Sequence, residues 1–278
     1  MIEVKNVEKS FGDSKVLKGI TTTFETGKTN LIIGQSGSGK TVLSRASMGL
    51  LTMSTAHRTG TVIFDGQDLS TAPRDTVRST WGTGMAMIFQ DPMTALNPVR
   101  RIGSQLTEGL RVRLGMSKKE ARGRAIELLK LVRIPDPEKA LRKFPNQLSG
   151  GMRQRVMIAI ALACNPKLLF ADEPTTALDV TVQAQILQLL SDLRKELNMS
   201  MVLVTHDLGV VAGHTDKIAV MYAGEVVEYG ETKELFANVR MPYTEALLNS
   251  IPRLDQKSSG RMTVIEGRLP DPTKPEPA

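Results

Sequence analysis

Cysteine is nearly absent from the sequence, because Cys164 is the only one among 278 residues. A single cysteine cannot form an internal disulfide bond, so the sequence predicts a reducing compartment such as the cytoplasm. Free cysteines are among the residues most often buried in proteins. We therefore interpret Cys164 as a small buried hydrophobic residue rather than as a nucleophile.

Long hydrophobic runs are absent as well. The longest uninterrupted apolar run, residues 156–164, contains nine residues, whereas a membrane-spanning helix needs about 20. The opening residues MIEVKNVEKS lack the apolar core of a secretory signal peptide, and no internal repeat is visible. We therefore expect a globular protein that does not span a bilayer. With 41% hydrophobic residues, the chain can form a buried core, either as one large domain or as two coupled lobes.

Positive charge is concentrated in one part of the sequence. The net charge of the whole chain is +7, but residues 100–155 alone contain 15 Lys and Arg against 5 Asp and Glu. Such a run is typical of a solvated helical face, of a surface that approaches anionic lipid headgroups, or of a nucleic-acid-binding surface. Charge by itself does not choose among the three.

Short apolar segments alternate with segments of helical periodicity along most of the chain. The runs TNLIIG, MAMIFQ, KLLFADE and MSMVLVTHD are typical of buried strands. This alternation predicts an α/β fold with a parallel core sheet that binds its ligands at the carboxyl ends of its strands. Before the glycine-rich segment GQSGSGKT, IEVKNVEKSFG and VLKGITTTFETG alternate with period two and predict an N-terminal antiparallel β subdomain.

The middle of the chain departs from this pattern. Residues from about 91 to 160 are predicted to form an inserted α-helical subdomain, in which Ser117 caps a helix and Pro135 stops it. Further along, IAVMYAGEVVEYG is predicted to be a hairpin that turns at Ala223 and Gly224.

The segment GQSGSGKT, residues 34–41, has the spacing of a mononucleotide-binding P-loop. Glycines let the backbone curl around a triphosphate, Lys40 supplies a charge to the β and γ phosphates, and the Thr41 hydroxyl can ligate Mg²⁺. The apolar strand before the loop and the helical segment after it supply the context that the motif requires. The residues expected to contact ATP here are Gly34, Ser36, Gly37, Ser38, Gly39, Lys40 and Thr41.

Polar residues end three other predicted strands. The segment LLFADEP contains Asp172 at the end of the predicted strand, and this carboxylate is expected to reach Mg²⁺. Glu173 follows it and could polarise a water molecule that attacks the γ-phosphate. Gln90 in IFQDP and His206 in LVTHD are natural sensors of the γ-phosphate and the attacking water, although an isolated Gln or His is often only exposed. Gln90 is also expected to ligate the metal.

The segment LSGGMRQR, residues 148–155, forms a second phosphate-binding motif. Its serine and glycines open an apolar helix, and a serine hydroxyl, glycine N–H groups and a helix N-terminus all favour an anion. The expected ligand-binding residues are Ser149, Gly150 and Gly151. The sequence thus contains two phosphate-binding loops.

Taken in order, these motifs resemble those of the nucleotide-binding subunit of an ATP-binding cassette (ABC) transporter, over roughly residues 2–230. The matching motifs are the Walker A loop GQSGSGKT, the Q-loop Gln90, the signature LSGGMRQR, the Walker B strand LLFADE, the D-loop TTALD ending at Asp179, and the switch residue His206. Phe11 falls where the family stacks the adenine ring; the alternative is a residue of the strand core.

The resemblance implies an ATPase that uses ATP and Mg²⁺, with Glu173, His206 and Gln90 as catalytic residues. In this family two subunits dimerise head to tail, so that the signature loop of one closes over the ATP held by the other. The second subunit is expected to be identical or paralogous. This arrangement accounts for the second phosphate-binding loop.

Two segments resemble the oligopeptide, dipeptide and nickel importer branch of the family: QDPMTALNP, residues 90–98, and PYTEALLNSIPRL, residues 242–254. The resemblance implies membrane permease partners on other chains, an extracytoplasmic solute-binding protein, and uptake of peptides or a related small solute. It places the chain peripherally at the cytoplasmic face of the plasma membrane. Members of the branch often carry a cysteine-containing C-terminal motif, which this sequence lacks, so no iron–sulfur role is supported.

Two other functions remain open. The N-terminal segment up to the P-loop also resembles ATPases of lipid-trafficking ABC systems. A non-transport ABC ATPase acting on nucleic acid would suit the basic region, but such proteins carry long coiled-coil insertions or two fused cassettes. Neither occurs here, and no nucleic-acid partner is expected.

The domain boundaries follow from these motifs. Residues 1–230 are predicted to be the nucleotide-binding domain, and residues 231–278 a C-terminal extension. Four prolines among the last nine residues predict that the extension ends in a flexible tail.

Overall fold

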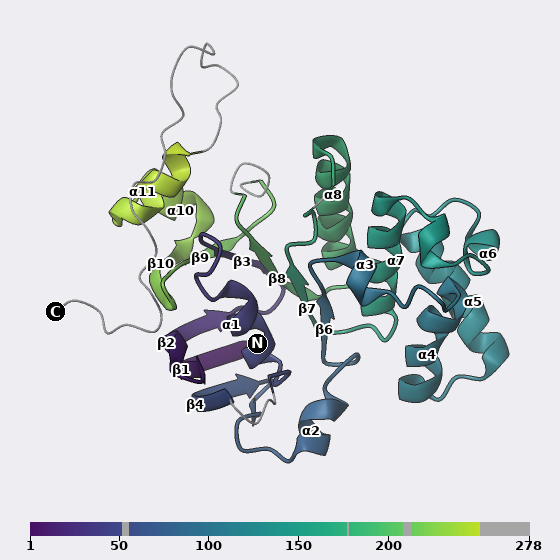
Figure 1. The fold of residues 1–278 in the computed structure, drawn as a ribbon, viewed down its shortest axis with the longest axis horizontal. Coiled ribbons are helices and arrows are strands. Elements are labelled where there is room, and N and C mark those ends of the chain that lie inside the picture. The colour runs from purple at the N-terminus through teal and green to yellow at the C-terminus, as the bar shows by residue number, and fades with distance from the viewer. Residues whose placement is uncertain (52–55, 177, 208–212, 251–278) are drawn as a thin grey trace, which may run out of the picture. The chain divides into compact units, whose positions relative to one another are not determined.

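The computed structural model describes residues 1–51, 56–176, 178–207 and 213–250. The chain divides into two compact units, one formed by residues 1–77 and 202–278 and the other by residues 78–201. Helix α2 (Arg74–Ser79) and strand β8 (Ser200–Thr205) run across the boundaries between them. Figure 1 shows the ribbon of the chain.

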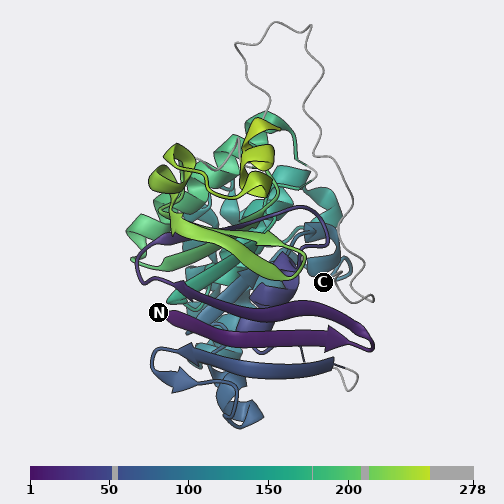
Figure 2. The same cartoon turned by 90° about the vertical axis from the view of Figure 1, so that its left-hand side faces the viewer.

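The first unit begins with an antiparallel sheet in the order β2-β1-β4-β5. Figure 2 shows its three longest strands side by side. The strands are β1 (Ile2–Phe11), β2 (Ser14–Phe24), β4 (Ala56–Phe64) and β5 (Gln67–Asp68). Side chains of β1 are buried at Ile2 and Val4, two residues apart as the period-two pattern requires, and a register shift after Val4 moves the buried positions to Val7 and Lys9. The predicted N-terminal antiparallel subdomain is therefore confirmed.

The same unit contains parallel strands. The fully buried β3 (Thr29–Ile33) pairs in parallel with β9 (Lys217–Tyr222), which pairs antiparallel with β10 (Glu225–Glu231). Ala223 and Gly224 connect β9 to β10 with φ angles of 47° and 87°, so the predicted hairpin turn is confirmed. In the described residues of this unit, besides the start of α2, the helices are α1 (Lys40–Ser47), α10 (Thr232–Ala237) and α11 (Pro242–Asn249).

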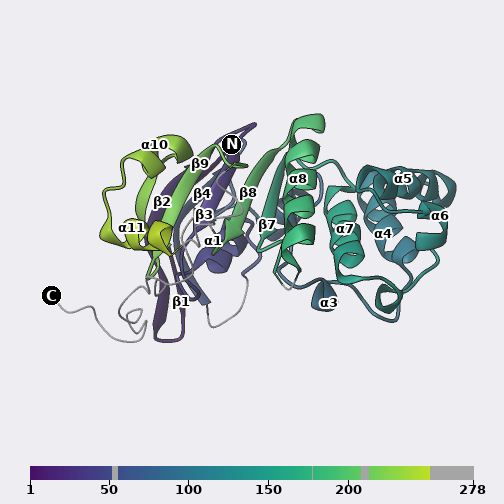
Figure 3. The same ribbon diagram turned by 90° about the horizontal axis from the view of Figure 1, so that it is seen from above.

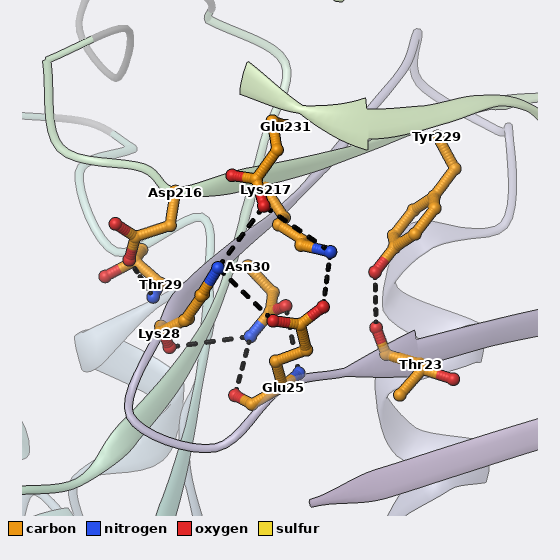
Figure 4. A network of polar contacts seen from close by, with 9 residues as sticks. All are labelled: Thr23, Glu25, Lys28, Thr29, Asn30, Asp216, Lys217, Tyr229 and Glu231. Atoms are coloured by element: carbon orange, nitrogen blue, oxygen red, sulfur yellow. Dashed lines mark hydrogen bonds and ion pairs between the residues drawn. The ribbon is translucent and has the colours of Figure 1, made fainter. Parts of the chain in front are cut away.

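An ion-pair network joins the loop before β3 to strands β9 and β10 (Figure 4). Lys217 pairs with Glu25, and Lys28 Nζ lies 3.3 Å from both Glu25 Oε2 and Glu231 Oε1. Hydrogen bonding to Lys217, followed by the bond to Lys28, lowers the pKa of Glu25, while the bond to Glu25 raises the pKa of Lys217. Tyr229 adds a hydrogen bond of 2.9 Å from its hydroxyl to the Thr23 carbonyl oxygen.

The second unit contains a parallel pair of fully buried strands, β6 (Met85–Ile88) and β7 (Leu168–Asp172). Helices α4, α5 and α7 pack on one another between these strands in the sequence, with α6 beside α5 (Figure 3). The helices of this unit, besides the end of α2, are α3 (Pro92–Ala95), α4 (Ile102–Leu114), α5 (Lys118–Leu131), α6 (Pro137–Ala140), the 3₁₀ helix η1 (Pro145–Gln147), α7 (Gly150–Leu162) and α8 (Val180–Glu196). The predicted α/β class with an inserted helical region is confirmed.

Local signals in the sequence explain the ends of α5. The Ser117 Oγ accepts from the Glu120 N–H at 3.3 Å, and the Glu120 carboxylate accepts from the Ser117 N–H at 2.8 Å, which is a complete capping box. The helix ends at Leu131, four residues before the predicted stop at Pro135. The predicted cap is therefore confirmed, whereas the helix has already ended before the chain reaches Pro135.

Cys164 lies just after α7 and is 8% exposed. Burial raises the pKa of its thiol, so the reactive thiolate is disfavoured at neutral pH. The interpretation of Cys164 as a buried hydrophobic residue is confirmed. Among the described residues, no helix is both long and apolar enough to cross a membrane.

The Glu25 network gives a pH-dependent prediction. Glu25→Gln should lower the free energy of unfolding at pH 7 by up to about 1 kcal/mol, since the pair with Lys217 is only partly exposed. The folded-state pKa of Glu25 is lowered, so its stabilisation is present above the unfolded-state pKa and is lost as pH falls through the folded-state value. The difference in free energy of unfolding between the unmodified chain and Glu25→Gln, measured by urea unfolding, should therefore become smaller from pH 7 to pH 3.5.

Glu225→Gln is the matched control for charge. Glu225 is an exposed carboxylate of β10, and the described part of the chain supplies no ion pair for it. The proposed stabilisation by the network would be contradicted if the difference in free energy of unfolding between the unmodified chain and Glu25→Gln did not change with pH. It would also be contradicted if Glu225→Gln lost as much stability as Glu25→Gln.

Candidate functional site: two phosphate-binding loops and a held carboxylate

The P-loop connects buried β3 to α1 in the first unit and wraps around its own lysine. Lys40 is only 5% exposed, although it carries a charge. Its Nζ donates to the carbonyl oxygens of Gly34 at 2.7 Å and Gln35 at 2.8 Å. These bonds compensate for burial of the ammonium group, and they hold the positive charge inside the loop where phosphates would bind.

Glycine is required in this loop by close backbone packing. A Cβ on Gly34 would collide with the Met221 carbonyl oxygen and lie 2.7 Å from Ser38 Oγ. Gly39 has a φ of 98°, and a Cβ there would lie 3.0 Å from Leu17 Cδ2. The loop therefore reaches its shape only without side chains at these positions.

The remaining P-loop residues differ in exposure. Ser36 and Gly37 are exposed, while Ser38 is fully buried and its Oγ has no hydrogen-bond partner among the described residues. Thr41, in the first turn of α1, is half-buried. A buried hydroxyl without a protein partner suits a site that binds a polar ligand.

The second unit places two carboxylates at the end of β7. Asp172 is fully buried, and Glu173 follows with a φ of 44°, which turns the chain sharply after the strand. Gln90 Nε2 donates to Glu173 Oε2 at 2.8 Å, and Thr176 Oγ1 donates to the same oxygen at 3.0 Å. Two donors on one oxygen fix the orientation of this carboxylate.

Thr176 is a site residue that the sequence analysis did not single out. It lies three residues after Glu173, and its backbone N–H donates to the Glu173 carbonyl oxygen at 3.2 Å. Such a turn brings a hydroxyl at position i+3 back to the carboxylate. The signal in the sequence is EPTT, residues 173–176, in which a proline and a threonine follow the acid as they often do in turns.

The signature loop opens α7. Ser149 is the N-cap, and its Oγ accepts from the Met152 N–H at 3.4 Å. The Arg153 Nε donates to the carbonyl oxygens of Pro145 at 3.0 Å and Leu148 at 2.9 Å, which anchors the segment before the loop. Ser149 and Gly150 are exposed, so the N-terminus of α7 is accessible.

Within the second unit, the signature loop lies against the start of α8. A Cβ on Gly151 would lie 2.9 Å from Val182 Cγ1, while one on Gly150 would meet Leu178 Cδ2 at 3.5 Å. Asp179 is exposed and caps α8, because its carboxylate accepts from the Val182 N–H at 2.9 Å. The signature and D-loop residues are therefore neighbours.

The Q-loop segment is ordered by hydrogen bonds of its own. Asp91 caps α3 by accepting from the Met93 N–H at 2.7 Å. Gln105 Oε1 accepts from the Asn97 N–H at 2.9 Å, and its Nε2 donates to the Asn97 carbonyl oxygen at 3.0 Å. Gln90 itself is exposed, so its amide sits at the surface of this ordered segment.

Phe11 and His206 belong, like the P-loop, to the first unit. Phe11 ends β1 and is half-buried, with the Lys9 Nζ 5.7 Å from its ring centroid; a partly exposed ring suits both interpretations of this residue. His206 follows β8 and is exposed. Each unit thus carries part of the predicted site residues.

The predicted metal ligands fit Mg²⁺ chemically. Thr41, Gln90 and Asp172 all offer oxygen donors, which Mg²⁺ prefers over nitrogen or sulfur. Within the described ranges, no group of three or more His, Cys, Asp or Glu side chains could hold a metal ion.

Comparisons with known proteins agree with these motifs. Residues 17–176 match the family model of ABC transporters, and residues 227–277 match that of the oligopeptide/dipeptide transporter C-terminal region. The oligopeptide transport ATP-binding protein OppD of Bacillus subtilis is 49% identical, over 99% of this chain and 78% of the relative. The dipeptide transport ATP-binding protein DppD of Lactococcus lactis is 47% identical, over 99% of this chain and 80% of the relative.

Solved structures give the same result. A dimeric, post-hydrolysis structure of the ATP-binding cassette MJ0796 bound to ADP and Pi has a TM-score of 0.74 and 32% identity. The match covers 84% of this chain and 99% of that one. The cassette CbiO1 of Clostridium perfringens, part of an ABC transporter complex, has a TM-score of 0.73 and 30% identity, over 89% of this chain and 98% of that one.

The contact between the signature loop and α8 gives a second prediction. Gly151→Ala should lower the free energy of unfolding by about 1–2 kcal/mol, because the new methyl group would displace Val182. Gly150→Ala is the matched control, since its methyl group would make only ordinary contact with Leu178. Urea unfolding without nucleotide measures both, and equal stability of the two variants would contradict the packing argument.

Proposed function

Because the chain belongs to the ABC transporter family, we propose that it is the ATPase subunit of an importer for peptides or a related small solute. ATP binding and hydrolysis follow from family membership, as the sequence motifs predicted. The peptide assignment is supported by relatives named for oligopeptide and dipeptide transport and by the match of the C-terminal region. These similarities favour this function over the lipid-trafficking and nucleic-acid alternatives.

In the proposed mechanism, the P-loop binds the triphosphate and Lys40 contributes its charge to the β and γ phosphates. The glycine N–H groups of the loop and the serines at positions 36 and 38 complete the cradle. Phe11 stacks on the adenine ring. Mg²⁺, held by Thr41, Gln90 and Asp172, would neutralise phosphate charge.

Glu173 is the proposed general base. Its carboxylate accepts a proton from the water that attacks the γ-phosphate, while the hydrogen bonds from Gln90 and Thr176 keep the carboxylate in position. His206 hydrogen-bonds the γ-phosphate. The contacts made by Glu173 are the single observation that carries this assignment, because they link the Q-loop to the carboxylate that follows the Walker B strand.

We propose that two such subunits close head to tail around ATP. Ser149, Gly150 and Gly151 then bind the γ-phosphate held by the partner subunit, and Asp179 lies beside them. The exposed N-terminus of α7 supports this role, since a helix N-terminus with N–H groups directed outward favours an anion. The partner cassette is identical or paralogous, and ATP binding and hydrolysis alternately close and open the pair.

The proposed membrane partners are permease subunits that dock on the Q-loop segment. Phe89, Met93 and Val99 are 42%, 58% and 79% exposed, and exposed large apolar side chains within one ordered segment suit a protein interface. The chain would therefore work peripherally at the cytoplasmic face of the plasma membrane. An extracytoplasmic solute-binding protein would deliver the substrate, and no nucleic acid would take part.

The domain organisation is also part of the proposal. Residues 1–230 would form the nucleotide-binding domain, with the helical subdomain at about 91–160 inserted in it, and residues 231–278 the C-terminal extension. Helices α10 and α11 belong to this extension, whereas the proline-rich tail lies outside the described residues.

The role of Glu173 leads to a third prediction. Glu173→Gln removes the base while it preserves the shape of the side chain. Turnover measured by phosphate release should fall by at least about 100-fold, while the equilibrium affinity for ATP stays unchanged. The variant should accumulate as an ATP-bound dimer in size-exclusion chromatography. Normal turnover would exclude Glu173 as the base.

A second substitution tests the head-to-tail arrangement in the same variant. Ser149→Arg added to Glu173→Gln should abolish the ATP-bound dimer, because the arginine would block the partner's phosphate. ATP binding by the monomer should remain. Loss of ATP binding by the monomer would contradict a role for Ser149 across the dimer.

The importer assignment leads to a fourth prediction. Affinity isolation from gently solubilised native membranes, followed by mass spectrometry, should recover two homologous permeases, a second cassette and a peptide-type binding protein. Met93→Glu with Val99→Glu should reduce permease recovery, while ATP binding is retained. Recovery of a lipid-transport partner, or of nucleic acid without a permease, would overturn the importer proposal.

A further inference from the structure

The C-terminal extension makes a direct contact with the P-loop. Tyr243 is the second residue of α11, and its hydroxyl oxygen accepts a hydrogen bond of 2.9 Å from the backbone N–H of Gln35. The two residues are 208 positions apart in the sequence, and both belong to the first unit. Gln35 is the second residue of the phosphate-binding loop.

The peptide group between Gly34 and Gln35 is held on both sides. Its N–H donates to the Tyr243 hydroxyl, and its carbonyl oxygen accepts from Lys40 Nζ at 2.7 Å. A peptide group is planar and rotates as one body, so a partner on the N–H also fixes the direction of the carbonyl. The Tyr243 hydroxyl therefore helps to determine where the Lys40 ammonium group lies.

The Tyr243 side chain is itself well supported. Its ring centroid lies 4.6 Å from that of Tyr222, with the ring planes 54° apart, a favourable aromatic geometry. Thr244 and Leu247 on the same helix are buried. Burial raises the pKa of the Tyr243 hydroxyl, so the side chain stays neutral at physiological pH.

We propose that Tyr243 is a positioning residue for ATP, through which the C-terminal extension keeps the P-loop in its phosphate-binding shape. This inference rests on the proposed function of the P-loop as the ATP site. It assigns a role to the described part of the extension: α11 fixes the peptide that orients Lys40. The affinity for ATP would then depend on whether α11 is docked against the P-loop.

Tyr243→Phe tests this role, because it removes the hydroxyl and keeps the ring against Tyr222. The full-length variant should bind a fluorescent ATP analogue about fivefold more weakly, which corresponds to about 1 kcal/mol and is the size expected for one hydrogen bond. The KM for ATP should rise by a similar factor with kcat unchanged. The midpoint of thermal unfolding without nucleotide should stay the same, which a merely structural role would not predict.

Tyr222→Phe is the matched control, since it removes the hydroxyl of the neighbouring ring while the ring pair is kept. Its ATP affinity should equal that of the unmodified chain. Equal ATP affinity in Tyr243→Phe and Tyr222→Phe, or a Tyr243→Phe effect only on unfolding, would overturn the inference. Failure of the unmodified chain to bind ATP would instead overturn the proposed function, which keeps the two outcomes distinct.

Discussion

Close approach of backbone to backbone around the P-loop is the constraint on which the first unit depends. The loop packs so tightly that Gly34 lies against the Met221 carbonyl, and Gly39 and Gly224 both approach the carbonyl of Val16. These contacts join β2, the end of β9 and the loop into one body. The loop makes an internal hydrogen bond of 3.2 Å from the Ser38 N–H to the Gln35 carbonyl oxygen. N–H groups that point at phosphates are not available for further internal bonds, so neighbouring segments must add to its stability.

The neighbours meet this need with ordinary hydrogen bonds. The Gly224 N–H donates to the Ser38 carbonyl oxygen at 3.2 Å, and the Lys18 N–H donates to the Gly224 carbonyl oxygen at 2.9 Å. Tyr243 then holds the Gln35 N–H from the other direction. The hairpin between β9 and β10 and helix α11 therefore both support the P-loop, although neither contains a phosphate-binding motif.

The carboxylate end of β7 follows the same principle in the second unit. Glu173 belongs to a sharp turn, and its side chain is oriented by donors from two different loops, at Gln90 and Thr176. A side chain held in this way loses little further freedom when a reaction occurs, which is the basis of preorganised catalysis. The hydrogen bond to Gln90 links the carboxylate to the segment that is proposed to contact a permease.

Signals that act over a few residues were readable in the sequence. The Ser117 cap and the turn at Ala223 and Gly224 were both predicted, because each depends on neighbours within four positions. The identity of the P-loop was readable for the same reason, since its residue types and spacing carry the chemistry. Asp179 shows the limit, because its helix-capping bond is local, yet its position beside the signature loop follows only from packing of α7 on α8.

The sequence by itself determined the chemistry: a P-loop, a Walker B carboxylate pair and a signature loop, and with them membership of the ABC transporter family. Only the tertiary structure decided which groups hold these residues in place. The contact between Tyr243 and Gln35 joins residues 208 positions apart, and no local pattern indicates that the two meet. The chemistry of each side chain follows directly from the identity of the residue. The hydrogen-bond partner of a backbone N–H group that is far away in the sequence is determined only when the whole core has packed.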